Sequence, residues 1–313
     1  MAARGGVNWK LKANETPPTH NNRSRGAGGV WNSANRLKYI LMTDEKNNQT
    51  LLPAITELSE QLYKIIADAF DNTFRGYLHG TDVKKNSKYF LIKSGLPHPI
   101  ANLLITRNQN DIGLLSEGVE SLCSDEFPSG VVCLGQVSSE AVKLLEDRGF
   151  QLAEEMPAMA IDLQDMTEAT LGGDYTFQQV GADEHDLWVD TFAKGYELPR
   201  EFANRFGPGN VPSIVKETEE YRYYVVFNND LPVSTSLDII RDGIVEVYCI
   251  STIPDYRGKG IGRFVTAEPL RIASEEGYKT AILQASLQGA PVYRHLGFDS
   301  FGVIPLYVRT PAQ

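Results

Sequence analysis

The sequence predicts an α/β protein in which helices flank a mixed, mostly antiparallel β-sheet. Three apolar runs typical of strands follow one another closely at 223–227, 233–240 and 244–251. Apolar residues recur at helical spacing over 51–70, and a second long helix is expected over 260–275. The chain has 313 residues, a length that favours two domains over one.

The predicted elements form two successive groups. In the first we expect a helix over 51–70, strands over 89–92 and 101–106, a helix over 112–122, a strand over 131–134 and a helix that Ser138 caps and Gly149 ends. In the second we expect a strand over 175–180, helices over 183–196, 199–206 and 211–219, the three strands named above, the helix over 260–275, a strand over 281–284, a helix over 290–296 and a strand pair over 298–308.

A repeat connects the two groups. Residues 131–163 and 281–309 both read strand, loop, helix, Gly-Phe, strand. Six residues after each Phe, an apolar residue stands before a proline. The matched pairs are Gly149-Phe150 with Gly297-Phe298, and Met156-Pro157 with Ile304-Pro305.

The repeat predicts two related domains, at 37–165 and 172–313. The preceding residues 1–36 are rich in Gly, Asn, Arg and Ser and contain one acidic residue, Glu15. Such a segment buries too little apolar surface to offset its ordering entropy, so we expect a flexible tail. An organelle-targeting peptide is the alternative, but the segment lacks a clear amphipathic period.

Bulk composition excludes several classes of function. A formal net charge of -10 repels phosphate backbones, which disfavours nucleic-acid binding. The acidity is compatible with a cationic acceptor, although solubility alone also accounts for it. The three cysteines form no CxxC pair, so we expect no metal site and no disulfide framework. No apolar run is long enough for a membrane span, and a cytoplasmic location is the default expectation.

The most informative segment is the glycine-rich loop at 254–263, which follows a predicted strand and leads into a helix. Its glycines let successive backbone N–H groups converge, and the helix start adds unpaired donors, so the loop is suited to hold a pyrophosphate. Arg257, Lys259 and Arg263 add positive charge. A P-loop and a dinucleotide fingerprint both fail, because no Lys-Ser/Thr follows and position 263 is not glycine.

With this loop the chain resembles the GNAT superfamily of N-acetyltransferases. Its signature, Arg or Gln followed by x-x-Gly-x-Gly or Ala, matches Arg257, Gly260 and Gly262. The later family motif, a Tyr just before Gly-Phe, is matched by Tyr293 with 297–298. The resemblance covers about 175–309. It implies two GNAT-like domains in tandem, of which the first is degenerate, because it lacks the loop and has Leu145 in place of Tyr293.

The resemblance implies acetyl-CoA as co-substrate, with its pantetheine arm along the strand end and its pyrophosphate in the loop. A backbone N–H on that strand would also polarise the thioester carbonyl. The residues expected to bind it are Ile250, Ser251, Thr252, Arg257, Gly258, Lys259, Gly260, Ile261, Gly262 and Arg263.

Two residues are candidates for acid–base catalysis. Deprotonating an amine of pKa ~10.4 at neutral pH costs about 4.6 kcal/mol, which a general base partly offsets. Glu246 is the candidate base, and the period of two along a strand places it with Tyr248 on the same face as Ile250. Tyr293 is the candidate acid that protonates the leaving thiolate. The alternatives are a cross-strand or surface carboxylate for Glu246 and a packing aromatic for Tyr293.

The resulting prediction is an N-acetyltransferase that acts on a primary amine of a small molecule or peptide. Two alternatives stay open: an acyl-CoA sensor without turnover, and an acyltransferase that uses another acyl group or a hydroxyl acceptor. The acceptor and the oligomeric state are not identified by the sequence.

Pro269 is expected to kink or locally adjust the helix over 260–275.

Overall fold

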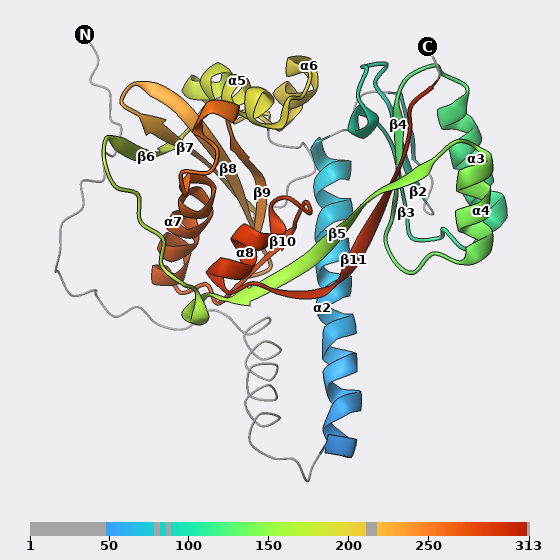
Figure 1. Cartoon of the computed structure of the whole chain (residues 1–313), viewed down its shortest axis with the longest axis horizontal. Coiled ribbons are helices and arrows are strands. Elements are labelled where there is room, and N and C mark those ends of the chain that lie inside the picture. Colours follow the sequence, from blue (N-terminus) through green and yellow to red (C-terminus); the bar gives the residue numbers. More distant parts are fainter. Residues whose placement is uncertain (1–47, 78–81, 86–88, 211–217, 312–313) are drawn as a thin grey trace.

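The computed structural model describes residues 48–77, 82–85, 89–210 and 218–311. The predicted tail at 1–36 and most of the predicted helix at 211–219 lie outside these residues. The described strands form one sheet of eleven, in the order β1-β2-β3-β4-β11-β5-β10-β9-β8-β7-β6, with helices on both faces (Figure 1). Of the described neighbours, only β3–β4 and β9–β10 pair in parallel, so the mixed, mostly antiparallel α/β fold is confirmed.

The elements follow the predicted order closely. The first half contains α2 (Asn48–Tyr77), β1 (Asp82–Lys85), β2 (Tyr89–Lys93), β3 (Asn102–Thr106), α3 (Ile112–Cys123), β4 (Ser129–Cys133), α4 (Ser139–Asp147) and β5 (Gln151–Asp162). The second contains β6 (Tyr175–Val180), α5 (His185–Tyr196), α6 (Arg200–Ala203), β7 (Glu220–Asn228), β8 (Leu231–Arg241), β9 (Ile244–Thr252), α7 (Ile261–Glu275), β10 (Thr280–Gln284), α8 (Ala290–Leu296) and β11 (Asp299–Arg309).

Two elements near the end of the chain differ from what the sequence predicts. The expected strand pair over 298–308 is a single strand, β11, which forms no hairpin because it pairs with β5 on one side and β4 on the other. Helix α7 runs unbroken past Pro269. Pro269 is one of the buried residues of that helix.

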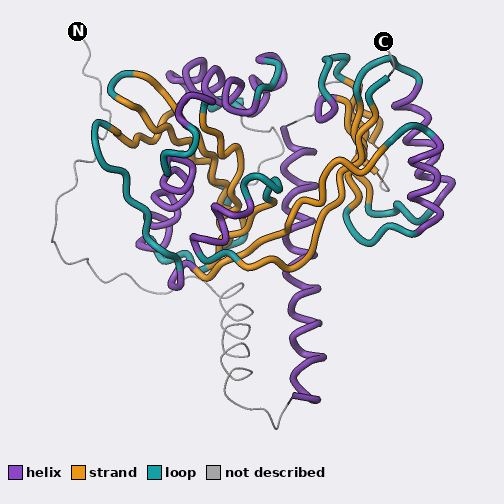
Figure 2. The backbone as a smooth tube through the Cα atoms, viewed as in Figure 1, coloured by secondary structure: helices purple, strands orange, loops and turns teal. Residues whose placement is uncertain are grey.

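The two halves exchange their last strands. Strand β5 of the first half lies between β10 and β11, and β11 of the second half lies between β4 and β5. Figure 2 shows these two long strands crossing between the two groups of shorter strands. The predicted repeat is confirmed in its element order, because β4-α4-β5 and β10-α8-β11 follow the same plan.

The exchange has an approximate two-fold relation at its centre. Met156 and Ile304 occupy equivalent positions in the repeat, and they are also direct partners across β5 and β11. A residue that precedes Met156 therefore pairs with one that follows Ile304, as in Glu155 with Pro305. In the same way, Pro157, which follows Met156, pairs with Val303, which precedes Ile304. A two-fold axis that passes between equivalent residues produces this register.

Different groups of helices cover the two faces of the sheet. On one face the core contains residues of α2, α5 and α6, among them Phe70, Trp188 and Phe202, all 6% exposed or less. On the other face, in the second half, α7 and α8 cover a core that includes Leu270 and Leu296. Helix α2 contacts β5, β10 and β11, so it packs beneath the exchanged strands (Figure 1).

Strand β8 carries an unpaired carboxyl into the interior. Asp238 is 2% exposed, and its Oδ1 has no hydrogen-bond partner among the described residues. Burial raises the pKa of Asp238 from 3.8 to about 8, and Arg222 on β7 offsets only part of this rise. At a pH between these two values, the folded protein therefore keeps the Asp238 carboxyl protonated, whereas the unfolded chain has released that proton.

Asp238 should make the protein less stable as the pH rises from about 4 to about 8. The folded state binds the extra proton in that window, so the free energy of unfolding should fall by at most about 1.4 kcal/mol per pH unit. Asp238→Asn should remove this slope, as measured by urea unfolding at several pH values. Asp230→Asn, in the exposed β7–β8 turn, is the matched control and should keep it. A slope unchanged in Asp238→Asn would show that Asp238 does not cause it.

Candidate functional site

The site begins where strands β9 and β10 stop pairing. Their parallel register runs from Ile244–Thr280 to Glu246–Ile282 and then ends. Strand β9 nevertheless continues to Thr252, still bonded to β8 on its other edge. Beyond Glu246, one backbone edge of β9 therefore has no neighbouring strand.

A β-bulge at Cys249 marks this divergence. Ser236 on β8 lies opposite two residues of β9, because Leu237 pairs with Tyr248 and Thr235 with Ser251. Cys249 has a φ of 52°, in the left-handed region that non-glycine residues rarely occupy. A bulge bends its strand and increases the local twist, which turns β9 away from β10.

The bulge corrects one prediction about side-chain direction. Glu246 and Tyr248 share a face as predicted, and Tyr248 packs with the core beside α2 and α5. Ile250 instead packs with the core beside α7, on the opposite face. The extra residue at position 249 shifts the alternation by one, so the period of two fails across it.

Hydroxyl groups of β8 hold the end of β9 in place. Thr235 Oγ1 donates to the Cys249 carbonyl at 2.9 Å and bonds Ser251 Oγ at 2.8 Å. Ser234 Oγ donates to the Ser251 carbonyl and lies 3.1 Å from Thr252 Oγ1. The predicted pantetheine-binding segment 250–252 is thereby fixed from the β8 side, leaving its other backbone edge unpaired.

The glycine-rich loop presents a run of free backbone donors. After the turn Pro254–Tyr256, Phe264 N donates to Gly260 O at 3.1 Å and closes the first turn of α7. The amide N–H groups of 258–263 have no hydrogen-bond partner among the described residues. Gly258 and Gly260 have φ values of 75° and 80°, and a Cβ at either would meet nothing within 4 Å. Such an arrangement is suited to bind an anion.

The basic side chains of the loop differ in what they contact. The Arg257 guanidinium donates to the Thr252 carbonyl at 3.1 Å and to the Gly195 carbonyl at 2.7 Å, which ties the loop to β9 and α5. Lys259 Nζ lies 4.4 Å from the Tyr256 ring centroid. Arg263 on α7 is exposed and makes no ion pair with a described residue.

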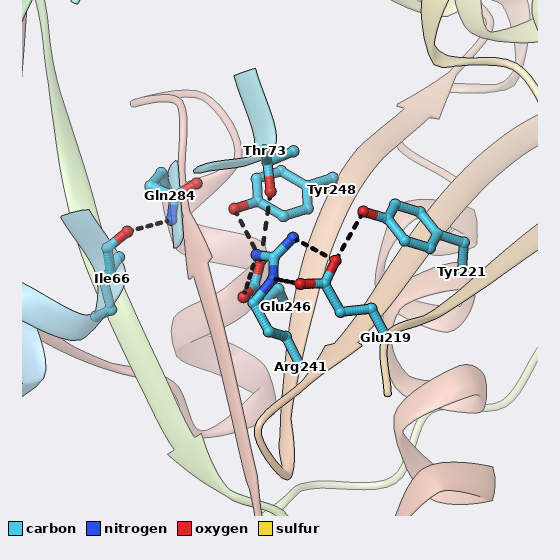
Figure 3. Close-up of polar contacts among 8 residues, drawn as sticks. All are labelled: Ile66, Thr73, Glu219, Tyr221, Arg241, Glu246, Tyr248 and Gln284. Atoms are coloured by element: carbon cyan, nitrogen blue, oxygen red, sulfur yellow. Dashed lines mark hydrogen bonds and ion pairs between the residues drawn. The ribbon is translucent and has the colours of Figure 1, made fainter. Parts of the chain in front are cut away.

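Glu246 lies in a buried network of polar side chains (Figure 3). Arg241 Nη1 contacts both carboxylate oxygens of Glu246 at 2.7 Å. Thr73 of α2 and Tyr248 each donate to Oε2 at 3.4 Å. Burial raises the pKa of Glu246 to about 7, although the Arg241 charge and its hydrogen bonds lower it. A carboxyl group with this pKa can exchange a proton at neutral pH.

Tyr293 lies on α8, on the other face of the sheet. It is 8% exposed, and its ring packs edge-on against Phe298 with centroids 6.0 Å apart. Burial raises the pKa of its hydroxyl well above the ordinary value, so the phenol keeps its proton at neutral pH. The structure thus places the two predicted acid–base residues on opposite faces of the sheet, beside the divergence of β9 and β10.

Two further residues belong to the surroundings of Tyr293. Tyr196, at the end of α5, is 46% exposed, yet burial of its hydroxyl raises its pKa, and the nearby Tyr293, Cys249 and Glu154 raise it further. Glu154 of β5 accepts a hydrogen bond from Leu287 N at 2.6 Å, in the loop before α8. No local sequence pattern identifies Glu154, because only the strand exchange brings β5 next to β10.

The equivalent place in the first half is closed. Strands β3 and β4 pair from Leu103–Gly130 to Thr106–Cys133, and a further bond joins Leu134 N to the Thr106 carbonyl at 2.8 Å. No divergence of the β9–β10 kind follows, so the backbone edge at the end of β3 is occupied.

Side chains also fill the start of α3, which corresponds to the start of α7. Asp111 Oδ1 accepts from Leu114 N at 3.2 Å and caps the helix. Asn110 bonds to Ser138 N at 2.8 Å and to the Gln136 carbonyl at 3.1 Å. A carboxylate therefore lies where α7 presents free amides, and it would repel a phosphate.

Part of the chain is similar to one family of known proteins. Residues 184–298 match the model of the acetyltransferase (GNAT) family. An acetyltransferase of Streptococcus pyogenes serotype M1, described as uncharacterized, is 33% identical over 81 residues, which cover 26% of this chain and 57% of that protein. A second one, from serotype M3, is 32% identical over the same shares. The match thus spans little more than half of these relatives.

Solved structures share the fold. A GCN5-related N-acetyltransferase of Kribbella flavida superposes with a TM-score of 0.54 at 15% identity, covering 80% of this chain and 96% of that one. One from Sphaerobacter thermophilus gives a TM-score of 0.54 at 15% identity, covering 76% and 84%. Residues 184–298 are thus similar to the acetyltransferase (GNAT) family, and the fold is one that solved N-acetyltransferases share.

Two general features complete the description of the site. In the described part of the chain, no three His, Cys, Asp or Glu side chains come together in a way that could hold a metal ion. Helices among these same residues are either too short or too polar to cross a membrane.

Proposed function

We propose that the second half of the chain transfers an acetyl group from acetyl-CoA to a primary amine. The observation that carries this proposal is the run of unpaired amides at 258–263 beside the unpaired edge of β9. Both parts of an extended, phosphorylated thioester would find backbone partners there. The corresponding β3–α3 junction of the first half has a paired strand end and a helix start capped by Asp111.

The co-substrate would bind in two segments. Its pyrophosphate would accept hydrogen bonds from the amides of 258–263 at the positive end of the α7 dipole, with Lys259 and Arg263 nearby as cations. Its pantetheine arm would pair with the backbone of 250–252. The Arg257 side chain would act indirectly, because it joins the loop to β9 and α5 through backbone carbonyls.

The reaction needs two proton transfers. The amine nitrogen attacks the thioester carbonyl, a C–N bond forms and the C–S bond breaks. Glu246 would take the proton that the amine loses, directly or through water, since its pKa of about 7 suits a base near neutral pH. Tyr293 would give its proton to the departing thiolate, and burial keeps that hydroxyl protonated beforehand.

The acceptor is proposed to be a cationic amine of a small molecule or peptide. Glu154 presents a half-buried carboxylate next to Tyr196, which is itself close to Tyr293. A protonated amine would be attracted to this carboxylate before it loses its proton. The first half would thus contribute to the acceptor site through β5, while its own closed β3–β4 junction leaves it without co-substrate.

Incubation with acetyl-CoA and a mixed panel of amines, followed by detection of free thiol, tests the proposal. We expect thiol release that depends on at least one amine, with the acetylated amine as second product. Tight binding of acetyl-CoA without thiol release for any amine would favour a sensor. Thiol release only with alcohols would reassign the acceptor.

Gly260→Glu should abolish acetyl-CoA binding while the protein stays folded. A Cβ at this position meets no protein atom within 4 Å, and the carboxylate beyond it would enter the space in front of the free amides. Isothermal titration should show a loss of at least 100-fold in affinity, which is about 2.7 kcal/mol. Gly243→Glu is the matched control, because Gly243 also has a φ of 80° and open space around it. Retained affinity in Gly260→Glu would contradict the placement of the pyrophosphate.

Tyr293→Phe should slow acetyl transfer more than it weakens acetyl-CoA binding. General acid catalysis typically contributes about 10²- to 10⁴-fold, so kcat should fall by about 10²-fold or more. The dissociation constant for acetyl-CoA should stay within a few-fold. Tyr278→Phe, which removes a hydroxyl beside the same core, is the control. An unchanged kcat in Tyr293→Phe would remove the acid role.

A further inference from the structure

Three charged side chains are buried together beneath the candidate site. The Arg241 guanidinium lies between the carboxylates of Glu219 and Glu246 (Figure 3). The three side chains are 11%, 8% and 5% exposed, respectively. Two negative charges thus face one positive charge where water screens them little.

The groups that surround Glu246 supply no second cation. Thr73 faces it from α2, Arg241 from β8 and Tyr248 from β9 itself. Glu219 and Tyr221 face Arg241 from the start of β7. The described neighbours other than Arg241 are neutral or acidic, so the group keeps one uncompensated negative charge.

Arg241 holds the two carboxylates differently. The guanidinium donates to Glu219 through two nitrogens, with Nε at 3.0 Å from Oε1 and Nη2 at 3.4 Å from Oε2. Glu219 also accepts a hydrogen bond from the Tyr221 hydroxyl at 3.3 Å. Glu246 receives one nitrogen, Nη1, which bridges both of its oxygens. Arg241 therefore divides its donors between the two carboxylates, with two nitrogens on Glu219 and one on Glu246.

We propose that Glu219 is a positioning residue for acetyl transfer, which, by sharing Arg241, leaves Glu246 able to take up the proton of the acceptor amine. The proposal deepens the proposed function and rests on Glu246 as the base. Glu219 itself contacts no reacting atom. Its effect passes through Arg241, which would otherwise neutralise Glu246 and make it a weaker base.

The proposal requires that removing the charge of Glu219 make Glu246 more acidic. In Glu219→Gln, Arg241 faces one carboxylate instead of two. A carboxylate paired with one unshared guanidinium has its pKa lowered by about 1–3 units. The acidic limb of the pH–rate profile should therefore move down by about one pH unit or more, and the plateau rate should fall with the weaker base.

The matched control is Glu220→Gln. Glu220 adjoins Glu219 in sequence and carries the same charge, but it is half-exposed and pairs with Arg222 at 2.8 Å and 2.9 Å. Its substitution changes the net charge equally and should leave the midpoint of the acidic limb in place. A shift of equal size in both variants would mean a general charge effect and would overturn the proposal.

Carbon-13 NMR of the glutamate side-chain carboxyls gives a readout that needs no turnover. The Glu246 signal is assigned by its loss in Glu246→Gln. In the wild-type protein it should titrate near neutral pH, and in Glu219→Gln at lower pH. A wild-type Glu246 that titrates in the ordinary acidic range would overturn the proposal even if Glu219→Gln failed to fold.

The NMR titration and the pH–rate profile together distinguish a failure of the positioning role of Glu219 from a failure of Glu246 as the base. If the NMR titration shifts and the pH–rate midpoint shifts with it, the positioning role is supported. If the NMR titration stays in place, the coupling through Arg241 is wrong, whatever the rates. If the NMR titration shifts while the pH–rate profile does not, Glu246 is not the base, and both the positioning role and that part of the proposed function fail.

Discussion

The geometry of the site depends on the point at which β9 and β10 cease to share hydrogen bonds. Up to Glu246 the two strands form an ordinary parallel pair, and from Cys249 onward β9 turns away. That one irregularity leaves a backbone edge unpaired at 250–252, places Tyr248 and Ile250 on opposite faces and orients the loop that follows. The first half, in which β3 and β4 pair to their ends, shows the same plan without it.

The network around Glu246 shows how the two halves depend on each other. Thr73 of α2 belongs to the first half, and Glu219, Arg241 and Glu246 belong to the second. Gln284 of β10 donates in turn to the Ile66 carbonyl of α2 at 3.2 Å. Helix α2 therefore forms part of the environment in which the candidate base is desolvated, and desolvation is the main reason for its raised pKa.

Local sequence patterns were sufficient to predict most of the helices and strands and the glycine-rich loop at 254–263. Glycine spacing predicted a helix over 260–275, which begins one residue later at Ile261, and apolar periodicity predicted α2, which continues to Tyr77. The alternation along β9 failed at Cys249, because a bulge at a non-glycine residue has no sequence signature. The partnership of Arg241 with Glu219 and the approach of β5 to β10 depend on tertiary pairing, which no local pattern contains.

The exchange of β5 and β11 has a consequence for the order in which the chain can fold. The gap between β4 and β5 is filled by residues 299–309, which follow β5 by more than a hundred positions in sequence. During synthesis, the edges of β4 and β5 that pair with β11 therefore stay unpaired until those residues emerge. Contacts of such long range slow folding, and exposed edges invite pairing with other chains. A nascent chain of this kind would be prone to exchange β11 with a neighbouring copy, giving a dimer in which each molecule completes the other's sheet.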